Sequence, residues 1–137
     1  MLLIDDVAIN LMVISRMFDR LRIPHIKCSS ATAALQAINK AIPRAIFTDL
    51  WMPEVGGDEL VKLLQASPQT AKIPVFLVTA DTQVDASIRA LFRTIIFKPI
   101  SINSLRKIIA DYLPDLLPDD APAGQAGAPS QNAQPEA

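Results

Sequence analysis

Five polar residues of this chain end or follow short apolar runs and could do chemistry together. They are Asp5, Asp6, Asp49, Thr79 and Lys98. Three carboxylates brought close together repel one another, and each raises the pKa of the others unless a cation compensates their charge. A hard divalent ion with oxygen ligands, such as Mg²⁺, suits that arrangement. The chain has one cysteine and one histidine. Because these offer no cluster for zinc, Mg²⁺ is the predicted cofactor.

Such a set of side chains is suited to phosphoryl transfer. A carboxylate beside Mg²⁺ can attack phosphorus and form an aspartyl phosphate, while the metal and a lysine neutralise charge on the transferred oxygens. Lys98 would supply the positive charge and Thr79 a hydroxyl donor. This chemistry requires the side chains to meet at one place, which depends on the elements that carry them.

Five short apolar runs alternate with five segments of helical period. The predicted strands are 2–5, 23–27, 45–48, 75–79 and 94–97, and the predicted helices are 8–21, 31–41, 57–66, 84–92 and 102–113. Ser30 and Ser101 stand at N-cap positions, and Pro114 follows the last helical turn. This alternation favours an α/β fold with a mostly parallel sheet and helices on both faces. Sites in such folds lie beyond the carboxyl ends of the strands.

Composition limits both the domain count and the class of partner. The chain of 137 residues is half hydrophobic, which is enough for one domain and too little for two. Residues 118–137 are rich in Pro, Ala, Gly and Gln, so we expect a disordered tail or linker after a folded part of residues 1–117. We expect a cytoplasmic protein with no membrane segment and, at a net charge of −1, no direct contact with nucleic acid.

Four stretches of the sequence resemble the signature blocks of response-regulator receiver domains, the CheY-like domains of two-component signalling systems. They are LLIDD, FTDLWMPEVGGDEL, VTAD and FKPIS, and the resemblance extends from residue 1 to about residue 113. It implies a flavodoxin-like (βα)5 fold, in which a doubly wound parallel sheet has the strand order 2-1-3-4-5. It also implies a histidine kinase or a histidine phosphotransfer protein as the partner that donates the phosphoryl group.

The resemblance assigns roles to the acidic cluster. Asp49 would be the phosphoacceptor, and Asp5 and Asp6 would be metal ligands together with Asp49. The backbone carbonyl of Trp51 would be a further ligand of Mg²⁺.

The same resemblance assigns supporting roles around that cluster. Thr79 and Lys98 would contact the phosphoryl oxygens, Pro53 and Gly57 would shape the loop after the third strand, and the Lys98-Pro99 peptide would be cis. The side chains of Trp51 and Asp81 would affect the water that hydrolyses the acyl phosphate. We expect the indole to hinder that water and the carboxylate to orient it.

Two features depart from the family pattern. Ile95 occupies a position that often holds an aromatic switch residue, which bears on how phosphorylation reaches an output surface. The stretch from Thr79 to Lys98 is a few residues shorter than usual, so we expect a shortened fourth helical segment.

Three functions from different classes are compatible with these residues. The leading one is a phosphorylation-controlled switch or relay, alone or as part of a hybrid histidine kinase, which catalyses its own phosphotransfer and dephosphorylation without being an enzyme in the usual sense. The second is a pseudo-receiver, an interaction module without phosphorylation. The third is an enzyme that uses Asp49 as a nucleophile, although the DxD pattern of aspartate-based phosphatases is missing at Asp49-Leu50-Trp51.

Overall fold

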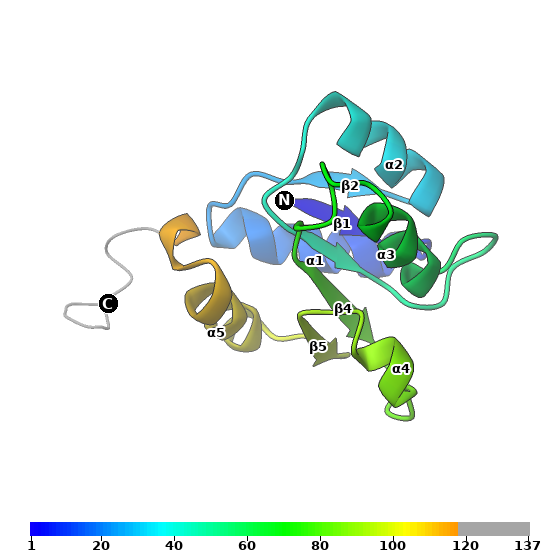
Figure 1. Ribbon diagram of the computed structural model, residues 1–137. Helices are drawn as coiled ribbons and strands as arrows, with labels where there is room; N and C mark the ends of the chain where they lie inside the picture. The colour runs from blue at the N-terminus through cyan, green and yellow to red at the C-terminus, as the bar shows by residue number, and fades with distance from the viewer. Residues whose placement is uncertain (118–137) are drawn as a thin grey trace, which may run out of the picture. The chain divides into compact units, whose positions relative to one another are not determined.

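The computed structural model describes residues 1–117 (Figure 1). These residues fall into two compact units. The first unit comprises Met1–Arg16 and Pro24–Ile100, and the second, among the described residues, comprises Met17–Ile23 and residues 101–117. The predicted tail, residues 118–137, lies outside the described residues. Among residues 1–117, no helix combines the length and the apolar character needed to span a bilayer.

All five strands belong to the first unit and form one parallel sheet. They are β1 (Leu2–Ile4), β2 (Ile26–Cys28), β3 (Ile46–Thr48), β4 (Val75–Thr79) and β5 (Thr94–Phe97). Their order, β2-β1-β3-β4-β5, confirms the prediction. Ile4 is in register with Thr48, and Thr79 with Phe97. The carboxyl ends of the strands therefore meet at one edge of the sheet.

Helices connect the strands. They are α1 (Ala8–Arg20), α2 (Ala31–Lys40), α3 (Gly57–Gln65), α4 (Ala86–Arg89) and α5 (Ile102–Tyr112), followed by a short 3₁₀ turn, η1 (Pro114–Leu116). Both predicted N-caps are present: the Ser30 hydroxyl accepts from the Ala33 N–H at 3.1 Å, and the Ser101 hydroxyl accepts from the Ser104 N–H at 3.1 Å. Such caps satisfy backbone donors that the helix itself leaves without partners.

Two predicted elements were wrong in extent. The second strand was expected at 23–27 but begins at Ile26, because Pro24 has no N–H to give to a sheet ladder. The fourth helix was expected at 84–92 but spans Ala86–Arg89, which confirms the expected shortening of this segment although not the expected bounds. A hydrogen bond from the Gln83 N–H to Asp81 Oδ1 holds residues 81–83 in a turn before it, and after it the N–H of Arg93 already bonds the Val75 carbonyl as the chain enters β5.

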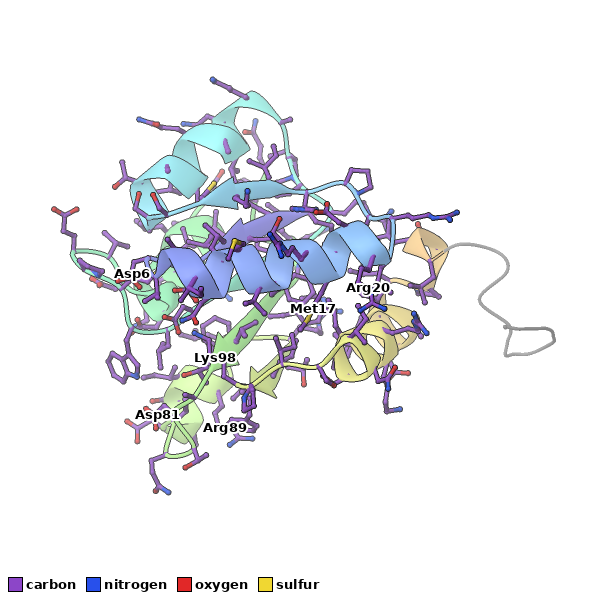
Figure 2. The ribbon with its side chains drawn as sticks, turned by 180° about the vertical axis from the view of Figure 1, so that it is seen from behind. Asp6, Met17, Arg20, Asp81, Arg89 and Lys98 are labelled. Carbon is purple, nitrogen blue, oxygen red and sulfur yellow. The ribbon has the colours of Figure 1, made fainter. Side chains whose placement is uncertain are left out.

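One face of the sheet is covered by the part of α1 that belongs to the first unit (Figure 2). Phe47 and Phe76 point to this face from adjacent strands, with their rings stacked at 4.8 Å between centroids. Val13 and Ile14 of α1 line a cavity together with Phe47. Because side chains alternate along a strand, the neighbouring strand residues face the other way.

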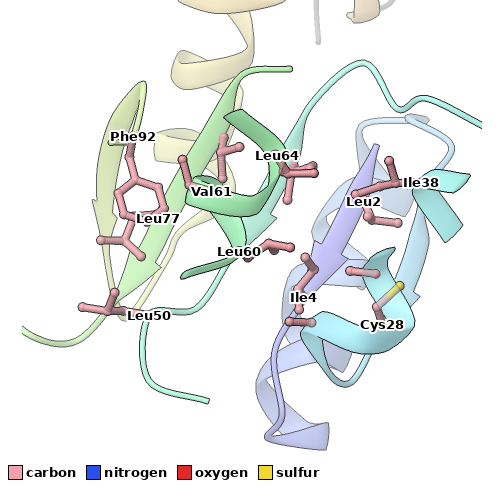
Figure 3. Packing of buried hydrophobic residues seen from close by; sticks show 14 residues of the cluster. Leu2, Ile4, Cys28, Ile38, Leu50, Leu60, Val61, Leu64, Leu77 and Phe92 are labelled. Atoms are coloured by element: carbon pink, nitrogen blue, oxygen red, sulfur yellow. The ribbon is translucent and has the colours of Figure 1, made fainter. Parts of the chain in front are cut away.

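The opposite face carries the main core of the first unit (Figure 3). Leucine and isoleucine side chains of β1, β3 and β4 pack there against α2 and α3. The cluster includes Leu2, Ile4, Ile38, Ile46, Leu60, Leu64 and Leu77, all nearly inaccessible to water. Burying each such side chain contributes about 1.5–3 kcal/mol. This packing fixes the positions of β1 and β3, the strands that the acidic residues follow.

The second unit contains the last turn of α1, α5 and η1. The N–H groups of Leu21 and Ile23 bond the carbonyls of Met17 and Phe18, and Arg22 between them adopts a positive φ of 60°. This left-handed residue ends α1. Leu105 and Ile109 of α5 are buried.

Candidate functional site

Three carboxylates meet at the carboxyl-terminal edge of the sheet. Asp5 and Asp6 follow β1, and Asp49 follows β3, the neighbouring strand. One oxygen of each lies within 4.8 Å of the others. Asp5 and Asp49 are buried, with 6% and 9% of their surfaces exposed, whereas Asp6 is exposed. The predicted cluster is therefore present, with one side open to solvent.

Lys98 enters the same cluster from the end of β5. Its Nζ lies 3.0 Å from Asp5 Oδ2 and 3.7 Å from Asp49 Oδ1. The backbone places it there, because the Lys98 N–H donates to the Thr79 carbonyl at 2.9 Å and so extends the pairing of β4 with β5. Seen from behind, Lys98, Asp6 and Asp81 lie at the same end of the sheet (Figure 2). The ammonium offsets part of the negative charge of the cluster.

The environment of Asp49 disfavours its charged form. Burial raises the pKa of this carboxyl, and the carboxylates of Asp5 and Asp6 raise it further. The Lys98 ammonium and the Leu50 N–H, which donates to Asp49 Oδ1 at 2.9 Å, oppose that rise. Burial and the repulsion of its neighbours outweigh the stabilising contacts. A bound cation would therefore relieve a real electrostatic cost.

Thr79 ends β4 beside these groups and is 1% exposed. Its hydroxyl oxygen accepts a hydrogen bond from the backbone N–H of Asp81 at 3.1 Å. A hydroxyl has one proton and two lone pairs, so the hydroxyl proton points away from this N–H. The hydroxyl therefore keeps a proton that it can donate to another acceptor.

Trp51 lies in the loop after β3 and is 64% exposed. Its indole N–H donates to Asp81 Oδ2 at 3.3 Å, although the two residues are 30 positions apart. Sequence reasoning placed both residues at the site but missed this contact. Neither residue type specifies a partner, and only the fold brings the two loops together.

Close backbone approach shapes the loop between β3 and α3. The Gly57 N–H donates to the Leu50 carbonyl at 3.0 Å, and a Cβ on Gly57 would collide with the Asp49 carbonyl oxygen. Pro53 lies in the same loop, as predicted, and its carbonyl accepts from the Val55 N–H at 2.8 Å. Glu54 has a positive φ of 68°. Non-glycine residues seldom adopt this conformation, so the sequence did not predict it.

A cavity of about 410 Å³ opens beside the cluster, which the sequence did not indicate. Its walls are mainly apolar and come from α1, the central strands and the segment after β5, including Val13, Phe47, Val78 and Ile100. Asp5, Asp49 and Lys98 border it. The Lys98-Pro99 peptide at its rim is cis, as the resemblance implied.

Residues 1–110 match the family of the response regulator receiver domain. The chain belongs to this family.

The receiver domain also resembles particular relatives. It is 33% identical over 92 residues to an uncharacterized response regulatory protein of Shewanella oneidensis, covering 67% of this chain and 38% of that protein. It is 29% identical over 137 aligned residues to the virulence sensor protein BvgS of Bordetella pertussis, covering 94% of this chain and 11% of BvgS.

The fold of the receiver domain is found among solved structures as well. One is the receiver domain of the sensor histidine kinase PA1611 of Pseudomonas aeruginosa PAO1, with a TM-score of 0.75 and 22% identity over 81% of this chain and 93% of that one. The match covers only 38% of the length of the Shewanella oneidensis relative and 11% of the length of BvgS, so this chain spans less than half of each of these two curated relatives.

Proposed function

We propose that this receiver domain accepts a phosphoryl group on Asp49, with the help of Mg²⁺, from a histidine kinase or a histidine phosphotransfer protein. One observation carries the proposal: the buried Asp49 carboxylate shares its site with Asp5, Asp6 and Lys98. The two neighbouring carboxylates can hold a metal beside the nucleophile, and Lys98 is already within reach of the oxygens that would be transferred. The module would act as a switch or relay in two-component signalling.

The residues present fit a hard divalent ion. Three carboxylate oxygens within 4.8 Å of one another supply oxygen ligands of the kind that Mg²⁺ prefers, and burial together with the neighbouring carboxylates raises the pKa of Asp49, an effect that a bound cation would oppose. Asp5, Asp6 and Asp49 would hold the ion together with the backbone carbonyl of Trp51. The solved PA1611 receiver domain has a magnesium ion coordinated in its active-site cleft, which supports the same choice. When bound, Mg²⁺ would neutralise charge on the transferred phosphoryl group.

In the transfer step, an Asp49 carboxylate oxygen attacks phosphorus while the bond from phosphorus to the donor's imidazole nitrogen breaks. The electron pair of that bond stays on the nitrogen, and Asp49 becomes an acyl phosphate. Lys98 would leave part of its contact with Asp5 to bind a phosphoryl oxygen, and the Thr79 hydroxyl would donate to another. Dephosphorylation ends the signal. Water attacks phosphorus, the bond from phosphorus to the Asp49 oxygen breaks, and the products are inorganic phosphate and the free Asp49 carboxylate.

Labelling with a small phosphodonor tests this proposal. Incubation with acetyl phosphate and Mg²⁺ should add one phosphoryl group to the wild-type chain, detected by intact mass and stable to acid but labile to base. Asp49→Asn should abolish the label, and so should EDTA. Asp85→Asn is the matched control, because Asp85 is an exposed carboxylate at the start of α4 whose side chain makes no cap hydrogen bond.

Full labelling of Asp49→Asn, or unchanged labelling of wild type in EDTA, would contradict the assignment. The same experiment separates the receiver from a pseudo-receiver, which would take no label under any condition.

A further inference from the structure

Thr48 is the last residue of β3 and carries a hydroxyl group into the interior of the protein. Its side chain is completely buried. Because side chains alternate along a strand, Thr48 points to the same face of the sheet as Ile46, the face that carries the main core. Ile4 and Leu77 stand beside it on the two neighbouring strands. A hydroxyl in such apolar surroundings is costly unless it has a hydrogen-bond partner.

The partner of this hydroxyl is the backbone of Asp49. The Thr48 hydroxyl donates to the Asp49 carbonyl at 2.9 Å. Gly57 packs against the same carbonyl so closely that a Cβ on it would lie 2.4 Å from the oxygen. The carbonyl is therefore enclosed, and Thr48 supplies a donor where a buried acceptor needs one. Residue type alone did not single out Thr48, because threonine is common in strands.

One peptide unit links this contact to the Asp49 carboxylate. The peptide between Asp49 and Leu50 is trans and planar, so its carbonyl and its N–H point in opposite directions. The carbonyl is held by Thr48, and the Leu50 N–H donates to Asp49 Oδ1 at 2.9 Å. A rotation of this peptide that broke the first hydrogen bond would also move the donor of the second. The Thr48 hydroxyl therefore fixes the direction of the N–H that holds the carboxylate.

We propose that Thr48 is a positioning residue, whose hydroxyl fixes the peptide between Asp49 and Leu50 and thereby orients the Asp49 carboxylate for attack on phosphorus. The consequence for phosphoryl transfer rests on the proposed function, whereas the contact itself does not. A fully buried side chain on the core face cannot touch a phosphodonor, so its effect must pass through the backbone. A nucleophile that is poorly oriented reacts more slowly even when the donor binds equally well.

Three variants separate the hydroxyl from the packing around it. Thr48→Val keeps the branched shape but replaces the donor with a methyl group, so the buried Asp49 carbonyl loses this hydrogen bond. Thr48→Ser keeps the hydroxyl and removes the methyl group. Ile46→Val removes one carbon from the same face of the same strand, and it is the control for lost core packing.

Amide hydrogen exchange tests the contact without any phosphoryl chemistry. The exchange rate of the Leu50 N–H is measured by NMR relative to that of the N–H at position 46, which bonds the Pro74 carbonyl in the same strand. This ratio cancels changes in overall stability. We expect Thr48→Val to raise the ratio roughly 2- to 10-fold, in line with the loss of one hydrogen bond. Thr48→Ser and Ile46→Val should keep the wild-type ratio. An unchanged ratio in Thr48→Val, or an equal rise in Thr48→Ser, would overturn the proposal.

The rate of labelling tests the consequence. With acetyl phosphate and saturating Mg²⁺, the maximal rate for Thr48→Val should fall roughly 2- to 10-fold, while the acetyl phosphate concentration that gives half of this rate stays the same. Thr48→Ser and Ile46→Val should label at wild-type rates. Wild-type kinetics in Thr48→Val, or a change in the half-saturating concentration alone, would overturn the positioning role. A wild type that takes no label would instead refute the proposed function, while the exchange ratio would still decide whether Thr48 holds this peptide.

Discussion

The loops after β3 and β4 border the same acidic cluster, but they are held in different ways. Backbone contacts hold the first: Gly57 approaches the Asp49 and Leu50 carbonyls, and Glu54 adopts a left-handed conformation. Side-chain oxygens hold the second: the Thr79 hydroxyl accepts from the Asp81 N–H, and Asp81 Oδ1 accepts from the Gln83 N–H. A loop determined by close backbone approach tolerates little change, whereas one held by exposed hydrogen bonds can be adjusted. We therefore expect the first loop to decide whether the site exists and the second to tune how it works.

The largest effect is expected for Gly57→Ala. The added methyl group would overlap the Asp49 carbonyl oxygen, so α3 must shift away from the end of β3. Chemical denaturation should show a loss of about 1–3 kcal/mol or more in the free energy of unfolding, and phosphoryl labelling should fall sharply. Asp85→Ala, at an exposed position, should cost little. A fully stable Gly57→Ala variant that still takes the label would remove the distinction between the two loops.

Trp51→Asn should have a smaller and purely kinetic effect. The substitution removes both the bulk of the indole and its bond to Asp81, while the backbone that shapes the loop stays the same. We expect the phosphoryl group to be lost roughly 10-fold faster, which corresponds to about 1.4 kcal/mol in the barrier. Decay can be followed by the mass of the chain after the phosphodonor is removed. Decay as slow as in wild type, or slower, would show that the indole does not exclude water.

The pH dependence of the free energy of unfolding should show that the folded state disfavours the charged form of Asp49, at the end of β3. Because folding raises the pKa of Asp49, chiefly through burial, its protonated form favours the folded state. That contribution is fully present below the unfolded pKa of about 4 and is lost as the pH rises through the higher folded-state value. In EDTA, wild type should therefore lose more stability than Asp49→Asn as the pH rises through this window. Parallel pH curves for the two proteins in urea denaturation would contradict this.

The smallest effect is expected for Ile95→Tyr. Ile95 lies in β5 opposite Leu77, packs against the main core and contacts neither loop through any hydrogen bond described above. The rate at which the phosphoryl group is lost should stay within about twofold of wild type. A large change would mean that a substitution in β5 alters the phosphorylation site directly, and that the two loops are not the main determinants of the rate at which the phosphoryl group is lost.

The sequence predictions were correct where residues close together in the chain determine the structure. The bounds of β4 and β5 were predicted correctly, because each is an apolar run rich in β-branched residues, with Pro74 before β4 and with Arg93 and Lys98 on either side of β5. The serine caps were also predictable, since a hydroxyl before a helix satisfies its orphan N–H groups in any context. The bounds of β2 and α4 were misjudged, because Pro24 cannot donate to the sheet and because the chain leaves α4 after Arg89 to enter β5, where periodicity alone would continue the helix.

The sequence by itself determined which residues could do the chemistry. Acidic residues and a lysine placed after apolar runs predict a cluster at one edge of a parallel sheet, because strand ends converge there. Only the tertiary structure decided which charged and polar groups in that cluster pair with one another. Lys98 pairs with Asp5 more closely than with Asp49, and Trp51 reaches Asp81 rather than the cluster. These contacts join residues 30 to 93 positions apart. Their geometry depends on strand order and register, which no local pattern encodes.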